Sequence, residues 1–586
     1  MMWRRHILLG AVLSLTLTTP AYADPVSVAI VSALALTGTA AAVATVALDI
    51  LFTIAVSALI NAVVGTPKSN RQAAIVTLAI GEQPRTAIFG EAAVGGTLCD
   101  AFNWGGDYGT DWECAIIAIA DHYCEGLVSF YVNDQLIPYP LGGFSGGTVP
   151  DQTVTGTQVI SGSTVTTTGT VKYNGQLQVW FLNGSASQTL PGVVTNGGWS
   201  TTGNFDGIAV AVVAYKADDP NSSNPVWSGG RPTFSWVVKG KRCYDPRYDS
   251  TVAGGSGSQR WTDPTTWIWS SNPIVCRYNW ARGIFANDAV TDPSALLLGR
   301  GLSAIEAPAA NVAVYANICD ETVALRSGGS EPRYSVAGVV QSTDKFADTE
   351  KMFADCVAGI VLQSSGSVEI EPGHARSTTF AITDDDLIVG VPMTFAAFRS
   401  IADNAWCNTV VPVYVEPTQK WQQHSAPVRR VATDVTADGA QREIALTLSF
   451  VSSNTQAQRC GEIQRRLGRL VRTGQITLGP RHMGIEEGDW GTWTSTRHLG
   501  GATVTFRVEG YQVNGQRQIM LTIREIASTV YDWSAPSDEM LSDITSTPVL
   551  PNSPFYQYRY GLAGQLNSQI IASSYEVGTN IVTASA

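Results

Sequence analysis

The 586-residue chain is too long for a single hydrophobic core and predicts about three or four domains. Charged residues make up only 15% of it, whereas it holds 56 glycines, 16 tryptophans and 19 tyrosines, which predicts a surface that is covered. The net charge of −12 argues against broad electrostatic attraction to nucleic acid, so that only binding through a local basic face remains possible.

The N-terminus has the pattern of a secretory signal peptide. Arg4 and Arg5 precede an apolar run at 7–18, and Ala21-Tyr22-Ala23 has the small residues that signal peptidase requires. Residues 25–65 follow with Asp49 as their only charge, which is enough apolar chain to cross a bilayer once or twice as helix. Such a segment must be buried either in lipid or in protein.

From residue 69 the pattern favours β-strands. "VSFYVNDQLIPY" predicts two strands that turn at Asn133-Asp134, and "TVKYNGQLQVWF" predicts a hairpin at Asn174-Gly175. Residues 142–205 are rich in Gly, Thr and Ser, and we interpret them as a β insertion. Strands resume with "GIAVAVVAY" and "TFSWVVKGKRCYDPR".

Three helices are predicted in the middle and later parts of the chain. "NVAVYANICDETVALRSGG" and "TDKFADTEKMFADCVAGIV" each have apolar residues on one face, and "TQAQRCGEIQRRLGRLVRTG" predicts a helix that ends at Gly474. The apolar faces of the first two contain Val312, Tyr315, Cys319 and Val323, and Met352, Phe353, Cys356 and Val357. "TVTFRVEGYQVNGQRQIMLTIREI" predicts a hairpin at Asn514-Gly515, and 530–586 has little periodicity.

Candidate catalytic patterns are weak. "GFSGG" at 143–147 lacks the strand before and the helix after its serine that a nucleophile elbow needs. Asp384-Asp385-Asp386 is more typical of a turn or helix cap than of acid–base chemistry. The nine cysteines form no C-x-x-C, and His122 between Cys114 and Cys124 lacks paired ligand spacings, so we favour buried thiols or one disulfide over a metal site.

The third helix carries several arginines. They make one side of it basic, and we interpret that side as a solvated face or as one paired with acidic groups of a neighbouring subunit. These arginines are Arg459, Arg465, Arg466, Arg469 and Arg472. Residue chemistry therefore argues against an enzyme, and no cofactor or metal is expected.

Eight short stretches, in fixed order across 69–530, resemble one family. They are "QPRTAIFGEAAVGG", "VSFYVNDQLIPY", "WVVKGKRCYDPR", "WSSNPIVCRYNWAR", "ANICDETV", "GGSEPRYSVAGVV", "DDDLI" and "AQRCGEIQRRL". Together they resemble the central tail hub, or tip attachment (host specificity), proteins of λ-like long-tailed bacteriophages and related prophages.

The resemblance implies an α+β, mainly β, multidomain hub with tube-like β domains, a few helices and an N-terminal hydrophobic helical segment. Family hubs are trimers in which each chain supplies two tube-like domains, so that three chains face a sixfold tail tube. The implied domains are 1–68, a hydrophobic helical segment that is retained; 69–300, a first hub domain with the insertion at 142–205; 301–400, a middle α+β domain; 401–530, later hub domains with the tube-like hairpin; and 531–586, an extended tail.

The resemblance also implies a set of structural motif positions, partners and a location. The motif positions are Arg85, Gly90, Gly95, Gly96, Asn133, Asp134, Lys241, Tyr244, Asp245, Pro246, Asn272, Pro273, Asn317, Cys319, Asp320, Glu321, Arg333, Tyr334, Gln458 and Arg459. The partners are two further copies, tail-tube or distal tail proteins, the tape measure protein, and a separate tip or fibre protein at the C-terminal segment. DNA passes only through the lumen, and 25–65 is a candidate contact with the host membrane. The protein is expected at the distal tip of the virion tail after assembly in the host cytoplasm.

One alternative remains from another class. An exported or membrane-anchored bacterial β-rich surface protein, with 1–23 removed and 25–65 in lipid, explains the N-terminus but not the ordered motifs.

Overall fold

The computed structural model describes residues 79–80, 83–107, 109–140, 146–160, 163–200, 202–217, 227, 231–364, 366–396 and 406–541. The chain divides into two compact units, Met1–Arg71 and Gln72–Ala586, and every described residue belongs to the second. The predicted hydrophobic segment, Ser145 of "GFSGG" and the end of the tail lie outside the described residues. Within the described ranges, no helix combines the length and apolar character needed to cross a bilayer.

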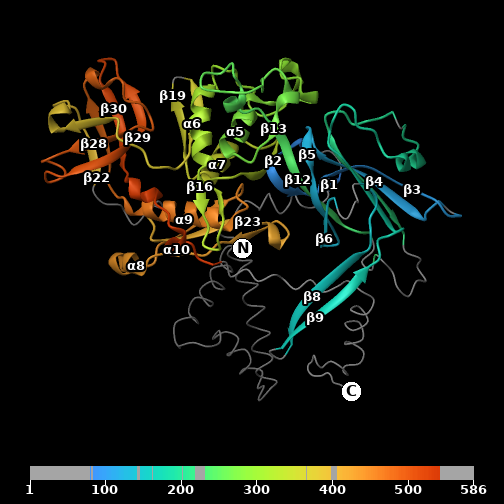
Figure 1. Cartoon of the computed structure of the whole chain (residues 1–586). Helices are drawn as coiled ribbons and strands as arrows, with labels where there is room; N and C mark the ends of the chain where they lie inside the picture. The colour runs from blue at the N-terminus through green and yellow to red at the C-terminus, as the bar shows by residue number, and fades with distance from the viewer. Residues whose placement is uncertain are drawn as a thin grey trace, which may run out of the picture. The chain divides into compact units, whose positions relative to one another are not determined.

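The first part of the described chain is a sandwich of two sheets (Figure 1). One sheet has the order β1-β3-β4-β11-β10-β7, and the other has the order β18-β2-β12-β5-β6 with β13 paired to β12. The strands are β1 (Ala79–Ile80), β2 (Thr86–Val94), β3 (Thr97–Trp104), β4 (Trp112–Ala120), β5 (Cys124–Val132), β6 (Gln135–Pro138), β7 (Gly147–Thr148), β10 (Leu177–Leu182), β11 (Ala209–Lys216), β12 (Phe234–Cys243), β13 (Ile268–Trp269) and β18 (Ala337–Gln341).

Strand β11 shows why the predicted strand "GIAVAVVAY" is apolar throughout. Ala211 and Val213 face the cluster between the two sheets, whereas Val210 and Val212 face a second cluster on the other side of the sheet. Both faces are therefore buried, and an alternating pattern is not needed. Apolar residues at every position thus keep this strand central in its sheet.

The predicted turn at Asn133-Asp134 is confirmed, and the predicted hairpin at Asn174-Gly175 is wrong. Both Asn133 and Asp134 have positive φ, and β5 pairs with β6 across them. The chain does turn at Gly175, but β9 (Ser163–Val171) pairs with β8 (Gln152–Ile160), whereas β10 pairs with β11 and β7. Figure 1 shows β8 and β9 as a two-stranded ribbon that runs away from the sheet.

Three helices follow the sandwich: α5 (Pro273–Arg282), α6 (Ala309–Cys319) and α7 (Phe346–Cys356). Helix α6 ends earlier than predicted, because the chain after Asp320 forms a hairpin of β16 (Thr322–Ala324) and β17 (Ser330–Pro332). Val323 therefore lies on a strand and not on the helix. The short strands here are β14 (Ile284–Phe285), β15 (Leu296–Leu298), β19 (Ile360–Ser364) and β20 (Ser367–Glu371).

The later part holds a six-stranded sheet of order β21-β28-β29-β30-β27-β22 around its own apolar cluster. Helix α9 (Asn454–Arg469) packs on β23 (Thr409–Glu416) of a separate four-stranded sheet and ends five residues before the predicted Gly474. The remaining elements are β21 (Phe380–Thr383), β22 (Thr394–Ala396), β24 (Gln422–Ser425), β25 (Arg429–Arg430), α8 (Ala432–Asp438), β26 (Glu443–Leu448), β27 (Thr473–Leu478), β28 (Trp490–Thr494), β29 (Thr503–Val513), β30 (Ile519–Glu525) and α10 (Ala535–Asp538).

The hairpin around Asn514-Gly515 forms between β29 and β30. Its loop is longer than a two-residue turn, because pairing resumes at Ile519 and Arg517 takes the positive φ. The described residues thus confirm the predicted mainly β, multidomain fold class with a few helices.

Candidate functional site

Four predicted motif residues form one hydrogen-bonded network with an arginine where α5, α6 and the end of β12 meet. Asp245 accepts hydrogen bonds from the Arg247 backbone N–H at 2.9 Å and from its guanidinium at 2.7 Å. Arg247 also donates to Asn317 at 2.9 Å and to Asp320 at 2.8 Å. Asn272 donates to the other oxygen of Asp320 at 2.9 Å. We call these five residues the arginine node.

Two prolines of the motifs start helices at this node. Pro246 and Pro273 each occupy the first turn of a helix, where the missing N–H costs nothing, and Asp245 and Asn272 cap the free N–H groups that follow. Tyr244 is buried, and its backbone N–H donates to the amide oxygen of Asn279 at 2.9 Å. The arginine node therefore joins the end of β12 to the helices.

Helix α9 carries the second group of motif residues. Arg459 is almost wholly buried and donates to Glu331 at 2.7 Å and to the backbone carbonyl of Arg333 at 2.8 Å. Arg333 in turn pairs with Glu321 at 3.1 Å. These contacts hold the β16–β17 hairpin against α9.

Tyr334 and Gln458 secure neighbouring segments. The Tyr334 hydroxyl donates to the carbonyl of Gly373 at 2.8 Å. Gln458 exchanges two hydrogen bonds with the backbone of Met540, at 2.8 and 2.9 Å, which fastens the segment after α10 to α9. Cys319 is buried in the core beside these contacts.

The remaining motif positions lie in the sandwich, away from the arginine node. Gly90 has φ of 67°, and a Cβ there would lie 1.8 Å from the Val336 carbonyl oxygen, so only glycine lets β18 pair with β2. Gly95 and Gly96 form the link from β2 to β3. Arg85 pairs with Asp121 at 3.2 Å, Asn133 and Asp134 make the β5–β6 turn, and Lys241 pairs with Asp288 at 2.8 Å.

The interpretation of the α9 arginines as a solvated or intersubunit face is wrong. Arg465 and Arg466 both pair with Glu462 of the same helix at 2.8 Å. Arg469 pairs with Asp438, and Arg472 pairs with Glu525. Partners for these charges come from the same chain, and sequence periodicity carries no information about such distant carboxylates.

The charged pairs around Glu462 shift its pKa. Burial by itself raises the pKa of Glu462, and the hydrogen bond and charge of Arg465, together with the charges of Arg429 and Arg466, outweigh burial and leave that pKa below its ordinary value. The carboxylate is therefore ionised in the folded protein at neutral pH, and it holds three guanidinium groups together.

Several candidates for chemistry have structural roles. The aspartates 384–386 form a short 3-10 helix in which Asp386 closes a capping box with Thr383. Both ring nitrogens of His122 are used, since Nε2 accepts from the Ile88 N–H at 3.0 Å and Nδ1 donates to the Tyr123 carbonyl at 2.8 Å. Burial, with a smaller contribution from Lys241, lowers the pKa of His122 to about 4. Within the described ranges, no group of three His, Cys, Asp or Glu residues is arranged to hold a metal ion.

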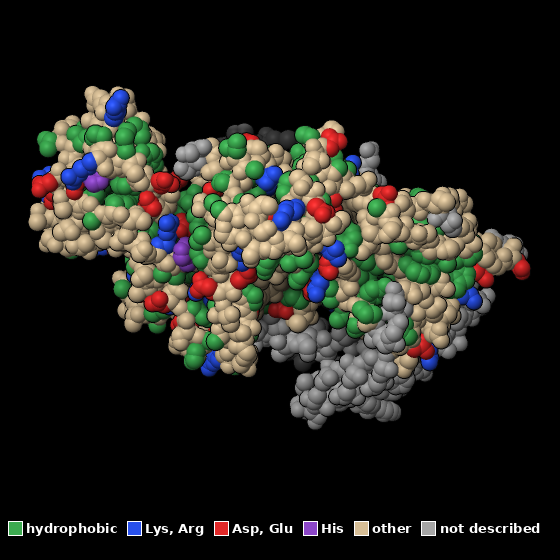
Figure 2. Space-filling model, turned by 45° about the horizontal axis from the view of Figure 1, so that its top comes forward, with side chains coloured by type: hydrophobic (Ala, Val, Ile, Leu, Met, Phe, Trp, Pro, Cys, Tyr) green, Lys and Arg blue, Asp and Glu red, His purple; other side chains and the backbone are tan. Residues whose placement is uncertain are grey.

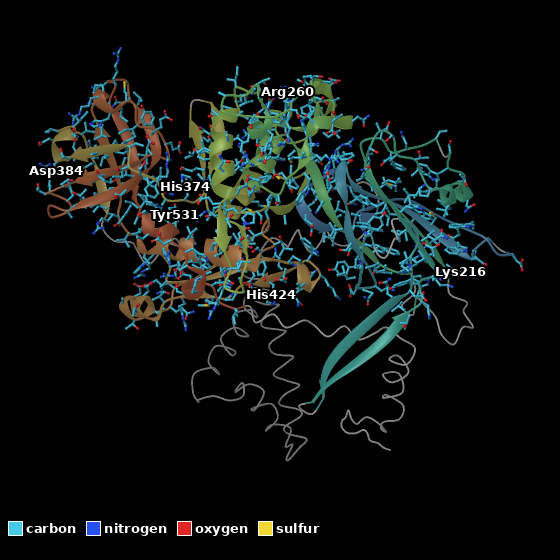
Figure 3. The ribbon with its side chains drawn as sticks, in the orientation of Figure 1. Lys216, Arg260, His374, Asp384, His424 and Tyr531 are labelled. Carbon is cyan, nitrogen blue, oxygen red and sulfur yellow. The ribbon has the colours of Figure 1, made fainter. Side chains whose placement is uncertain are left out.

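A second junction joins the β19–β20 hairpin to the later sheet. Arg376 donates to Glu371 at 2.7 Å and to the carbonyl of Gly488 at 3.1 Å. His374 and Tyr531, labelled in Figure 3, line the same small cavity at this junction. Tyr531 stacks on Trp490, so this junction is packed as well as hydrogen-bonded.

Sequence reasoning missed residues that complete these networks. Arg247 stands in the quoted "CYDPR" but was not singled out, and Glu331 stands in the quoted "GGSEPRYSV". The buried pair Arg277–Glu350, 2.6 Å apart, lies between α5 and α7 and was also missed. The nearby sequence does not distinguish these charged residues from exposed ones, because their partners lie far away in the chain.

Comparisons with known proteins add a partial match. Residues 351–510 match the family model of putative phage tail proteins. No curated protein matches the chain. A chain from the virion of a native gene transfer agent particle is 14% identical, with 80% of this chain and 89% of that chain covered and a TM-score of 0.48.

Two bacterial tail proteins are also similar. The tail protein from Neisseria meningitidis MC58 is 11% identical over 70% of this chain and 99% of its own, with a TM-score of 0.26. The 43 kDa tail protein of prophage MuSo2 from Shewanella oneidensis is 8% identical over 77% and 99%, with a TM-score of 0.24. Because every TM-score is below 0.5, none of these similarities establishes the role of this chain. The family match over residues 351–510, which includes helix α9 and its buried arginines, supports the coarser prediction of a structural phage tail protein.

Proposed function

We propose that this chain forms the trimeric central hub of a phage tail tip, joins the sixfold tail tube to the host-attachment apparatus, and acts as a channel or plug for genome delivery. The observation that carries the proposal is the presence of two separate β bodies in one chain. The sandwich and the later six-stranded sheet each enclose their own apolar cluster. Three chains would present six β bodies, which matches a sixfold tube.

The middle of the chain has the contacts that a rigid connector needs. The arginine node, the Glu331–Arg459 pair and the Glu371–Arg376 junction are hydrogen-bonded networks between helices, hairpins and the later sheet. Such networks resist relative movement of packed elements, although the buried Nε atoms of Arg333 and Arg459 have no hydrogen-bond partner among the described residues. A hub that transmits force from the tip to the tube needs this rigidity.

The cysteines agree with assembly in the host cytoplasm. All nine lie among the described residues and are free thiols, and eight of them are buried. Disulfides form in oxidising compartments and are rare in the cytosol. The proposed partners remain the tail tube or distal tail proteins, the tape measure protein, and a separate tip or fibre protein at the C-terminal segment.

The decisive experiment is native mass spectrometry of tail tips released from purified particles. The proposal expects a complex with three copies of this chain, and labelled antibodies should decorate the distal tip in electron micrographs. A stable monomer in the released tips, or labelling along the tail shaft, would contradict it.

The signal-like N-terminus favours one second candidate, the exported or membrane-anchored surface protein. Peptide mapping of purified particles separates the two functions. Peptides that span Ala23-Asp24 support a retained N-terminus in the virion, whereas a uniform new N-terminus at Asp24 and recovery in the cell envelope support the surface protein.

A further inference from the structure

Strands β8 and β9 form a sheet of their own, and we call this pair the ribbon. Their antiparallel register is unbroken from Gln152 opposite Val171 to Ile160 opposite Ser163. Among the described strands, no other strand pairs with β8 or β9, so the outer edge of each has no strand beside it there. The ribbon runs away from the sandwich (Figure 1), and its edges are therefore accessible to another chain.

The backbone of the ribbon has hydrogen-bonding groups to spare. In an antiparallel pair, alternate residues direct their N–H and C=O groups to the partner strand, and the residues between them direct these groups outward. The ribbon therefore has two rows of unpaired backbone groups, one along each edge. A two-stranded sheet is at best marginally stable alone in water, so a further strand on either edge would stabilise it.

The sequence of the ribbon lacks the features that keep strand edges apart. Its strands read "QTVTGTQVI" and "STVTTTGTV", without a charged residue or a proline, and their ladder has no bulge. Lysine, proline and bulges are common means by which proteins block pairing at an edge. The nearest charges, Asp151 and Lys172, lie at the base of the ribbon and pair with each other at 3.1 Å. Nothing in the two strands therefore opposes a neighbouring strand.

Each strand of the ribbon also has a glycine in its interior. Gly156 lies opposite Thr167, and Gly169 lies opposite Val154. An interior glycine weakens a strand, and it often marks a place where another backbone approaches closely. The threonines and valines around these glycines favour extended chain. The ribbon thus keeps its strand character while leaving room for a neighbouring backbone.

A second copy of this chain fits these edges. Its ribbon has the same length and the same lack of charge, so that two edges match over their whole length. Copies that are related by a threefold axis along the ribbons have their β8 strands in one direction and their β9 strands in the other. Three ribbons then form six antiparallel strands in a closed ring, which leaves no free edge.

We propose that β9 of one copy pairs edge to edge with β8 of the next copy, and that the three ribbons in this way hold the trimer together. This inference rests on the proposed function, because it takes three copies around one axis from there. It adds the surface through which the copies join.

Amide hydrogen exchange of tail tips released from purified particles tests whether the edges are paired. If they are paired, nearly all backbone N–H groups of residues 152–160 and 163–171 should exchange slowly. If they are open, about half of these N–H groups should exchange as fast as those of an unfolded peptide, because they point outward. Fast exchange of about half of them would overturn the proposal.

The Thr157→Lys variant tests whether a second copy supplies the neighbouring strand. Thr157 lies within β8, and a lysine there adds the kind of charge that blocks edge pairing. Thr522→Lys is the matched control, because Thr522 is exposed on β30, a strand that already has neighbours on both sides. Light scattering in increasing urea should show that the Thr157→Lys trimer dissociates at a lower urea concentration than the control and the unmodified trimer.

A variant without the ribbon, in which two glycines join Asp151 to Lys172, should dissociate at a lower urea concentration still. If both ribbon variants dissociate at the same urea concentration as the control, the proposal is overturned even where the ribbon exchanges slowly, because another tail protein then supplies the strand. That result leaves the trimeric hub standing. Unmodified tips that contain no trimer would instead contradict the proposed function, and this inference with it.

Discussion

The Glu462 carboxylate holds three guanidinium groups, and its removal should destabilise the middle of the chain strongly. It accepts from Arg465 and Arg466 at 2.8 Å and from Arg429 at 3.3 Å, and its side chain is 6% exposed. Glu462→Ala leaves the nearly buried Arg429 without a carboxylate partner, whereas Arg465 keeps its pair with Asp434. Loss of one member of a buried pair costs about 3–5 kcal/mol, so we expect a loss in that range in the free energy of unfolding.

The measurement is urea unfolding followed by circular dichroism at neutral pH, with Lys351→Ala as control. Lys351 pairs with Asp355 on the surface of α7 and should contribute less than about 1 kcal/mol. The folded pKa of Glu462 lies below its ordinary value near 4.5, so its contribution is complete above that pH and is lost as the pH falls through the folded pKa. A loss below about 1 kcal/mol at neutral pH, or no decrease of the effect in acid, would refute this account of α9.

Three further predictions follow from single contacts. Gly90→Ala should lower the free energy of unfolding by more than about 3 kcal/mol, because the added Cβ meets the Val336 carbonyl. Gly439→Ala also has positive φ but has open space around it, so it should lower the free energy of unfolding by about 1 kcal/mol in the same urea assay. Equal losses in the two variants would contradict the close approach at Gly90. His122 has a folded pKa of about 4, below its ordinary 6.5, so the stability of the protein should fall as the pH drops from 6.5 to 4. His122→Gln should flatten that part of a plot of melting temperature against pH. An unchanged plot would show that His122 is not the titrating group. Arg459→Met should expose the β16–β17 hairpin to faster amide hydrogen exchange by freeing Glu331, and unaltered exchange there would contradict the role given to that pair.

Local patterns predicted the strands and the central turns of the helices well, because these elements depend on neighbouring residues. The alternation and turn residues of β5 and β6, and the apolar face of α7 around Phe353, are visible within about ten residues of sequence. The end of α6 was missed because it is set by distant contacts. Asp320 accepts from Asn272 and Arg247, which lie 48 and 73 residues away in the sequence, and the chain leaves the helix there.

The hairpin at Asn174-Gly175 failed for a related reason. The local turn does form, since the Gln176 N–H donates to the Tyr173 carbonyl at 2.8 Å. Turn chemistry does not decide, however, which strands pair, and β10 finds a more apolar partner in β11 than in the Thr-rich β9. Burial of apolar side chains across the sandwich thus decides which strands pair, and the residues of a single hairpin carry no information about that burial.

The charge pattern of α9 shows most clearly how sequence and structure differ. Arginines at short helical spacing suggested a basic surface, yet Arg459 reaches Glu331, 128 residues away, and Arg469 reaches Asp438. These arginines are paired with carboxylates of the same chain. On the face shown in Figure 2, the other positively and negatively charged side chains are intermingled. The buried arginines are therefore part of the packing of the fold, and their spacing along α9 does not indicate a contact surface.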